Sequence, residues 1–400
     1  MMKKGLLGFV LVISCILPMT ALALDLKDYV EPDIFFQDAE LQALFNLKDG
    51  NQDQTSYNGS GKIWYDMEYS TLPFKWEAYA EGSGNISRGS NDEDDSVENW
   101  DISAWTEAKK YLREDEPRKF FVFGRLDFSY IDYEGLEDDD PYAKLTAGAG
   151  YGRIFTATPL MEAVRIVDDL TKYGIIKGTI SDAAYMKLAA VIHKENEYKS
   201  KYSLQEYEKY WYEDMEKVFK EAGVLTDGSL KAFGVIRIQD ILQDENVIRR
   251  EHGWEAKAGL GWLFSDYQGN EHDPSFGASF KYAEPFGFKW QFVEEFTYTT
   301  VLVDWEFGDA NHEFKNRMDL DYEISNKIDW TNYWEIAYTV IEDSDADDIL
   351  RNRLETGFRF YLTNTIDAIT TLRFDHRDQG DNEDDDIVTT FYMGIAYTIF

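Results

Sequence analysis

The five histidines are the first side chains whose types and spacing could do chemistry: His193, His252, His272, His312 and His376. No two of them have the i, i+4 spacing of a helical zinc site, and the sequence contains neither G-x-S-x-G nor a Walker-type phosphate loop. Gly148-Ala-Gly150-Tyr-Gly152 lies in a strand pattern, without the strand-turn-helix context of a dinucleotide site. We therefore predict no metal, no cofactor and no catalytic residue.

Asp375 and His376 carry the one enzymatic hypothesis that the sequence allows. They end a predicted strand at the same rim as His272 and His312. A carboxylate beside an imidazole could supply a general acid and base for a surface hydrolase. Carboxylates are abundant in this chain, however, so we keep the hydrolase as the third hypothesis and expect a protein that is not an enzyme.

Acidic side chains cluster in the predicted loops, where they could form a negative vestibule that concentrates cations. Asp343-x-Asp345-x-Asp347 imitates the start of a calcium-binding loop, but Asp348 replaces its glycine, so the match fails. The simpler alternative is that these loops only keep the surface soluble. The vestibule candidates are Asp94, Asp95, Asp138, Asp139, Asp345, Asp347, Asp384 and Asp385.

The composition limits the partners of the chain. With 40 Lys and Arg against 76 Asp and Glu, the net charge is −36, which would repel a nucleic acid. The hydrophobic fraction of 44% is too high for a disordered chain. We expect a folded protein that does not bind nucleic acid.

The N-terminal residues 1–23 read as a secretory signal peptide. Lys3 and Lys4 precede an apolar run, and Ala21-Leu-Ala23 provides the small residues of a cleavage site. Cleavage would remove Cys15, the only cysteine, and with it all disulfide chemistry. Lipid attachment to Cys15 after Val12-Ile-Ser14 is the alternative. In both cases the protein leaves the cytoplasm.

Most of the remaining chain alternates with a period of two, which is typical of β-strands. From Phe314 to Ile324 the even positions are mostly apolar, and the odd positions are charged. A soluble β-sandwich or lipocalin-like barrel would turn the apolar face inward. Strands of about 11 to 16 residues, mixed charges and many aromatics favour an apolar face toward lipid instead. The charged positions expected to line a lumen are Arg125, Asp127, Lys257, Lys315, Arg317, Asp319, Asp321, Arg351, Arg353, Glu355, Arg359 and Arg373.

The predicted connections alternate between long acidic loops and short turns. Outer-membrane barrels have long loops outside the cell and short turns in the periplasm, so the alternation assigns sides to the sheet. Thirteen strands alternate clearly, and the parity of sides then requires one more before Thr55. We assign it to Ala39–Leu47, which gives about fourteen strands, with twelve as the alternative.

Residues 155–249 interrupt the strands with a helical pattern. Expected helices are Leu160–Tyr173 after Thr158-Pro159, Ser181–Lys199, a segment from the Ser203–Glu206 capping box to Gly223, and Ser229–Leu242. By the parity of the loops this insert lies on the periplasmic side. It could be a domain below the barrel, a plug in the lumen or an appendage for stability. It divides the barrel strands into residues 24–154 and 250–400.

The end of the chain, from Phe391 to Phe400, resembles the final strand of Gram-negative outer-membrane β-barrel proteins. In that class a C-terminal strand with alternating apolar residues and a terminal aromatic is recognised by the barrel-insertion machinery. Phe400 departs from this pattern because it lies on the face opposite Phe391, Met393 and Ile395. Arg351 to Phe400 also faintly resembles the salt-induced outer-membrane protein family.

The resemblance implies a transmembrane antiparallel β-barrel in the outer membrane, in contact with lipid and lipopolysaccharide. The first functional hypothesis is a pore for passive or gated passage of small, cationic solutes. The alternative is a closed structural barrel whose periplasmic helices recruit an envelope or secretion partner.

Overall fold

The dominant element is an antiparallel sheet of fourteen strands, in which each strand pairs with its neighbours in sequence from β1 to β14. The computed structural model describes residues 24–113, 119–133, 141–203, 205–244, 248–265, 271–302, 310–340, 348–363, 366–379 and 386–397. The predicted strand number, antiparallel order and inserted helices are therefore confirmed, and the alternative of twelve strands is wrong.

The strands are β1 Ile34–Lys48, β2 Ser56–Ser70, β3 Phe74–Arg88, β4 Ser96–Tyr111, β5 Phe120–Asp132, β6 Tyr142–Thr156, β7 Glu251–Ser265, β8 Glu271–Phe286, β9 Trp290–Leu302, β10 Ala310–Ser325, β11 Ile328–Val340, β12 Ile349–Thr363, β13 Ile366–Gln379 and β14 Val388–Tyr397. The largest extensions beyond the sequence patterns are in β1 and β8. β1 begins at Ile34 rather than Ala39. The alternation predicts a strand over Phe276–Ala283, and β8 extends beyond both of these ends because its prolines lie near the strand ends, where proline is tolerated.

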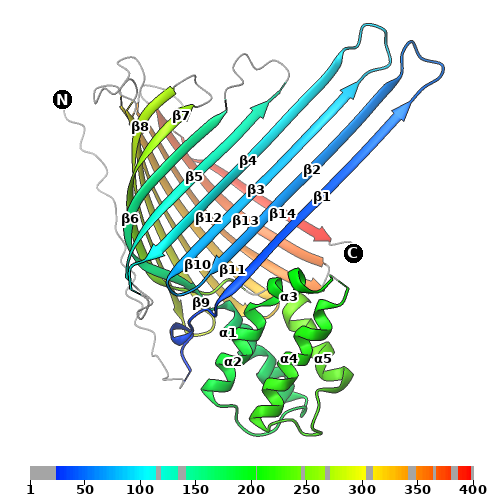
Figure 1. Cartoon of the computed structure of the whole chain (residues 1–400), viewed down its shortest axis with the longest axis vertical. Helices are drawn as coiled ribbons and strands as arrows, with labels where there is room; N and C mark the ends of the chain where they lie inside the picture. The colour runs from blue at the N-terminus through cyan, green and yellow to red at the C-terminus, as the bar shows by residue number, and fades with distance from the viewer. Residues whose placement is uncertain are drawn as a thin grey trace.

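The sheet curls on itself, so that β9–β13 lie behind β2–β5 (Figure 1). Within the described residues, β1 pairs only with β2, and β14 pairs only with β13. Closure of the sheet between β1 and β14 stays a prediction.

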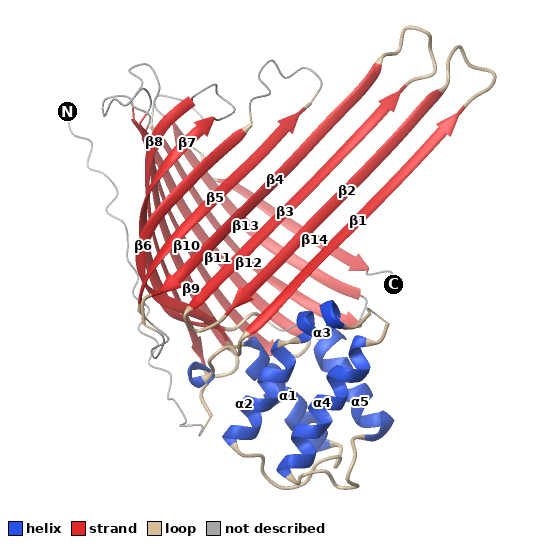
Figure 2. Ribbon diagram, in the orientation of Figure 1, coloured by secondary structure: helices blue, strands red, loops and turns tan. Residues whose placement is uncertain are grey.

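The connections alternate in length, as the sequence indicated. The turns at residues 71–73, 287–289 and 326–327 lie at one end of the strands, together with the helices. The longer connections at residues 49–55 and 89–95 lie at the opposite end (Figure 2). The sheet therefore has a short-turn end and a long-loop end.

The helical insert contains more helices than the four expected. They are α1 Thr158–Lys172, α2 Asp182–His193, α3 Glu195–Lys201, α4 Tyr207–Ala222 and α5 Lys231–Gln239, and a π-helical turn follows at Asp240–Asp244. The single helix predicted from Ser181 to Lys199 breaks at Lys194, which ends α2 and precedes α3. No helix in the described ranges has both the length and the apolar composition needed to cross a membrane.

Three predicted helix starts are wrong, and one is confirmed. α5 begins at Lys231 with Leu230 rather than Ser229 as its N-cap. Ala157 rather than Thr158 is the N-cap of α1, and Thr158 Oγ1 accepts a hydrogen bond from Arg250 N instead (2.8 Å). Glu206 rather than Ser203 is the N-cap of α4, without a side-chain capping bond. The Ser181 hydroxyl does cap α2, since it accepts a hydrogen bond from Ala184 N.

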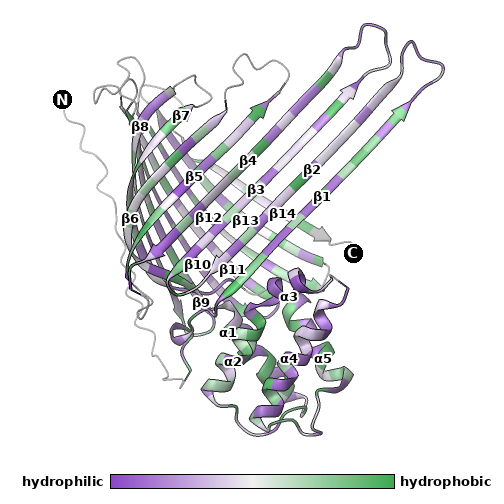
Figure 3. Ribbon diagram, viewed as in Figure 1, coloured by the Kyte–Doolittle hydropathy of each residue, from purple (hydrophilic) through white to green (hydrophobic). Residues whose placement is uncertain are grey.

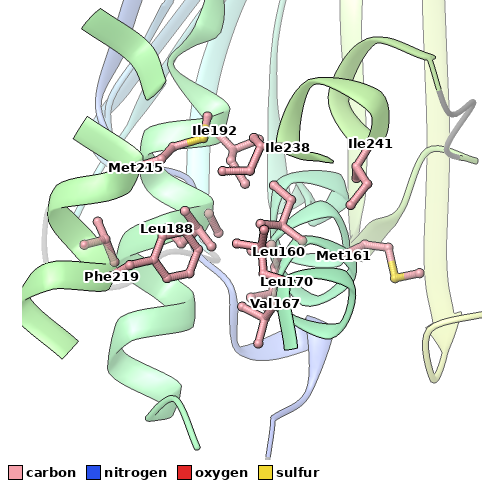
Figure 4. Packing of buried hydrophobic residues seen from close by; sticks show 14 of the residues in the cluster. Leu160, Met161, Val167, Leu170, Leu188, Ile192, Met215, Phe219, Ile238 and Ile241 are labelled. Carbon is pink, nitrogen blue, oxygen red and sulfur yellow. The ribbon is translucent and has the colours of Figure 1, made fainter. Parts of the chain in front are cut away.

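The helices form a hydrophobic core of their own (Figure 4). α1, α2 and α4 turn their apolar stripes inward, and Leu160, Leu188 and Phe219 are almost fully buried. Leu26 and Tyr29, from the segment before β1, belong to the same core. The helices lie at the short-turn end of the strands, with α3 in contact with β1.

Candidate functional site

One face of the sheet carries the charged residues singled out in the sequence. Side chains of directly paired residues point to the same face of a sheet. Lys315 pairs with Ala337, which in turn pairs with Arg351. Cross-strand pairs can be followed in this way from each strand to the next. All twelve candidates therefore share what we call the charged face: Arg125, Asp127, Lys257, Lys315, Arg317, Asp319, Asp321, Arg351, Arg353, Glu355, Arg359 and Arg373. That this face lines a lumen stays a prediction.

Ion pairs connect most of these side chains. Some partners were not singled out in the sequence, although Glu335, Asp367 and Asp375 alternate in phase with the candidates. The pairs are Arg125–Asp127 (2.6 Å), Lys315–Glu335 (2.8 Å), Arg317–Asp319 (2.8 Å), Arg353–Asp375 (2.7 Å), Arg359–Asp367 (2.7 Å) and Arg373–Glu355 (2.6 Å). The charged face is thus largely neutralised by ion pairs within and between its strands.

The opposite face, here called the apolar face, exposes large hydrophobic side chains. Leu260 is 72% exposed and Met393 is 77% exposed, far more than an aliphatic side chain tolerates in water as part of a continuous surface. Phe120, Phe276 and Phe314 are exposed on the same face. Figure 3 shows the resulting alternation of hydrophobic and hydrophilic residues along the strands.

A compact corner forms where β4 to β7 bend around the charged face. Lys109 Nζ lies 2.7 Å from Glu255, and Lys257 Nζ lies 2.6 Å from Glu107, so β4 and β7 meet across β5 and β6. Phe121 and Phe123 fill the space between them and are buried. Sequence alternation did not predict the burial of these two aromatics, because it indicates polar residues on this face.

Glycines make this corner possible. Gly148 and Gly150 of β6 pair with Phe123 and Phe121 of β5. A Cβ on Gly148 would lie 2.1 Å from the carbonyl oxygen of Ala258 and 2.7 Å from the Phe123 ring. The glycine-rich run at residues 148–152 therefore provides room for the aromatic side chains of β5. Its glycines, in alternate positions of a predicted strand, are the sequence signal from which this corner could have been found.

Buried charges join the helices to the sheet at the short-turn end. Glu323 of β10 accepts hydrogen bonds from Arg165 of α1 and from Arg250 Nη2 at 3.0 Å. Arg250 is fully buried and also donates to the Phe288 and Ile248 carbonyl oxygens. We call Arg165, Arg250 and Glu323 the floor triad. It couples three segments that are remote in sequence.

The segment before β1 forms a second attachment. The Tyr29 hydroxyl contacts the Ala189 carbonyl oxygen (3.3 Å) and His193 Nδ1 (3.2 Å) in α2, while His252 Nε2 lies 2.8 Å from the Tyr29 carbonyl oxygen. Burial lowers the pKa of the His193 imidazole, which keeps it neutral. These contacts attach α2 to the beginning of β7 through Tyr29.

The acidic vestibule candidates fall partly outside the described residues. Asp94 and Asp95 lie in the connection between β3 and β4 at the long-loop end, where Asp94 accepts a hydrogen bond from Asn91 N (2.9 Å). Asp138, Asp139, Asp345, Asp347, Asp384 and Asp385 lie outside the described ranges. The vestibule stays a prediction.

The hydrolase hypothesis gains no support from the geometry. Asp375 and His376 are consecutive in β13, so their side chains point to opposite faces of the sheet. Asp375 pairs with Arg353, whereas His312 contacts the Tyr298 hydroxyl on the apolar face. The described residues contain no group of three or more His, Cys, Asp or Glu side chains that could hold a metal ion. That the protein is not an enzyme stays a prediction.

Comparisons with known proteins return only distant structural likenesses. No family model matches the sequence, and no curated protein matches it. The structure is similar to the CymD monoaromatic hydrocarbon channel, with a TM-score of 0.23, 10% identity and 92% of this chain and 89% of that chain covered. A bacterial polysaccharide outer-membrane secretin gives a TM-score of 0.25, 10% identity and coverage of 89% and 96%. The outer-membrane protein OprD from Pseudomonas aeruginosa gives 0.26, 6% identity and coverage of 92% and 94%.

These TM-scores are low, so the description of the fold rests on the strand pairing of this chain alone.

Proposed function

We propose that the protein is an outer-membrane β-barrel pore for the passive or gated passage of small solutes, with a preference for cations. One observation carries the proposal: every strand has a charged or polar face and an apolar, exposed face, in the same phase across the whole sheet. If the sheet closes, the charged face lines an aqueous lumen and the apolar face contacts lipid.

The dimensions of the strands support a membrane location. They contain 10 to 16 residues each, against roughly 9–11 for a tilted strand within the hydrocarbon core. Trp76 and Trp100 are exposed on the apolar face, as expected for side chains at a membrane interface. The proposed partners follow: lipid and lipopolysaccharide around the apolar face, and the barrel-insertion machinery at the C-terminal strand that ends at Phe400.

A preference for cations is supported by the charge of the chain and by its loops. The net charge is −36, and Asp94 and Asp95 lie at the long-loop end, which would be the outer mouth. A ring of carboxylates raises the local concentration of cations and repels anions.

The helical domain is placed to act as a gate. It lies at the short-turn end, where the lumen would open into the periplasm, and the floor triad attaches it to the wall. Because β6 and β7 remain paired up to Thr156 and Glu251, the helices can be removed without interrupting the sheet.

The test is single-channel recording of the refolded mature protein in a planar bilayer with a salt gradient across it. We expect steady openings with a reversal potential of the sign that indicates cations. A variant in which a short turn replaces Thr158–Asp244 should be open for a larger fraction of the time. Silence from protein shown to be folded and inserted would refute the pore.

A closed docking barrel is the second candidate, and one feature of the helices favours it. Tyr173, Phe233 and Ile236 are exposed by 46%, 52% and 50% on the helical domain, and the Tyr173 and Phe233 rings contact each other edge to face. In this function the domain would recruit an envelope or secretion partner. We then expect the protein to form a stable complex with this partner and to conduct no current. The substitutions Phe233→Ser and Ile236→Ser should abolish the complex.

A further inference from the structure

Two arginines face each other directly on the charged face near its long-loop end. Arg351 of β12 is the cross-strand partner of Arg377 of β13. Like charges in directly opposed positions destabilise a sheet. Both side chains line a cavity of 480 Å³, together with Arg353, Glu335 and Asp375.

Two of the three carboxylates that line this cavity accept hydrogen bonds from other side chains. Glu335 accepts hydrogen bonds from Lys315 (2.8 Å) and from the Tyr333 hydroxyl. Asp375 accepts one from Arg353 Nε at 2.7 Å. Asp386, which precedes β14, also lines the cavity and makes no ion pair with Arg351. Within the described residues, the Arg351 guanidinium has no ion-pair partner.

The chemistry of this arrangement selects the ligand. A guanidinium presents parallel N–H donors that match the two oxygens of a carboxylate or phosphate group. An oxyanion bound to the Arg351 guanidinium would offset its repulsion from the neighbouring Arg377. We propose that the cavity is a binding site for the oxyanion group, carboxylate or phosphate, of a small solute.

This inference rests on the proposed pore only for the route by which the solute arrives. It adds selection by a specific contact to a lumen whose mouth favours cations. A solute bearing both a cationic group and an oxyanion would satisfy both parts of the molecule.

The experiment measures binding in detergent, independently of conduction. The refolded mature protein is titrated calorimetrically with inorganic phosphate and, in a second arm, with acetate, at low ionic strength. We expect saturable binding of at least one anion, and a loss of affinity of about tenfold or more in Arg351→Gln because a charge-assisted bidentate contact disappears. The stronger of the two arms identifies the oxyanion class.

Lys62→Gln is the matched control because it removes an exposed cation of the charged face at β2, outside the cavity. It should bind as the wild type does. Circular dichroism shows that both variants are folded, and Arg351→Lys, which keeps the charge but not the fork of donors, should bind more weakly than the wild type. Equal binding by Arg351→Gln and the wild type, or no binding by the wild type, would overturn the site.

A protein that binds phosphate or acetate but carries no current would refute the pore and retain the site. A protein that conducts current but binds neither anion would refute the site and retain the pore.

Discussion

Glu323 is the residue on which the contact between the helices and the sheet depends most. It is buried and compensates two arginines at once, Arg165 and Arg250. In Glu323→Gln the two guanidinium groups would lose the carboxylate that binds both of them and keep only the electrostatic attraction of Asp321 and Asp329, which we expect to cost about 3 kcal/mol. We expect the helices to unfold or detach at lower urea concentration than in the wild type, as measured by far-UV circular dichroism and amide exchange of α1.

A surface ion pair provides the comparison for this prediction. Lys187 and Glu221 lie 3.2 Å apart on the helical domain, but both are exposed. Glu221→Gln should therefore cost less than about 1 kcal/mol. If the two substitutions have equal effects, the floor triad does not hold the domain.

Glu162 of α1 makes the stability of the helical domain depend on pH. Burial and the nearby Glu195 raise the pKa of the Glu162 carboxyl from 4.5 to about 8 in the folded protein, against a smaller opposing effect of Arg165. The folded state therefore holds a proton that the unfolded state releases above pH 4.5. Its contribution to stability is complete below pH 4.5 and is lost as the pH rises to about 8.

Glu162→Gln separates this effect from all other titrations, because glutamine resembles the protonated acid. The variant should match the wild type at pH 4 and exceed it by about 1–3 kcal/mol at pH 8.5. Urea unfolding of the helices at both pH values measures the difference. A constant difference between the two proteins across this range would contradict the assignment.

Among the elements, β6 depends on a close approach that only glycine allows. In Gly148→Ala the new Cβ would meet the Ala258 carbonyl oxygen and the Cα of Gly259, both backbone atoms of β7. The strands must move apart, at a cost of about 1–3 kcal/mol or more. We expect a lower yield of folded protein and a lower melting temperature, read from the heat-dependent mobility of the protein in a detergent gel.

Gly124 in the neighbouring strand β5 is the matched control. A Cβ there meets nothing within 4 Å, so Gly124→Ala should fold normally and gain slightly from the reduced freedom of the unfolded chain. Equal destabilisation by both substitutions would show that strand propensity, rather than contact with β7, decides the outcome.

The elements also show what sequence patterns can and cannot predict. Alternation placed Lys315, Arg317 and Arg353 on one face correctly because a two-residue period is a local property of each strand. The buried position of Phe121 was missed because it depends on Gly150 in another strand. The Ser203 capping box failed because the Ser203 carbonyl oxygen, not its hydroxyl, accepts the amides of Glu206 and Tyr207.

At the scale of the whole molecule, the contacts that decide function are those between distant segments. The floor triad joins residues 158 and 73 positions apart in the sequence, and no local pattern predicts which arginine meets which glutamate. The strand count followed from the parity of long and short connections, which is a global constraint. The sequence therefore predicted the sheet and which of its faces is charged. It did not predict the contacts of the corner at β4–β7 or those of the floor triad.

Closure of the sheet is the prediction that belongs to the whole molecule. In a bilayer the free N–H and C=O groups along the outer edges of β1 and β14 would each cost several kcal/mol, so the two edges should pair. The strands run in opposite directions, and Gln42 of β1 lies on the charged face with Val388, Thr390 and Tyr392 of β14. Gln42→Cys combined with a cysteine at one of these three positions should form a disulfide in membranes, because paired residues lie within bonding distance.

The phase of the strands supplies the internal control for this cross-link. Phe391 lies on the apolar face of β14, so Gln42→Cys with Phe391→Cys directs the two thiols to opposite sides and should not cross-link. The experiment is clean because Cys15, the only native cysteine, lies in the predicted signal peptide. A ladder of cross-links restricted to the charged face would establish the closed barrel that a pore requires. Their absence from folded, inserted protein would contradict closure between β1 and β14, and with it both the pore and the closed docking barrel.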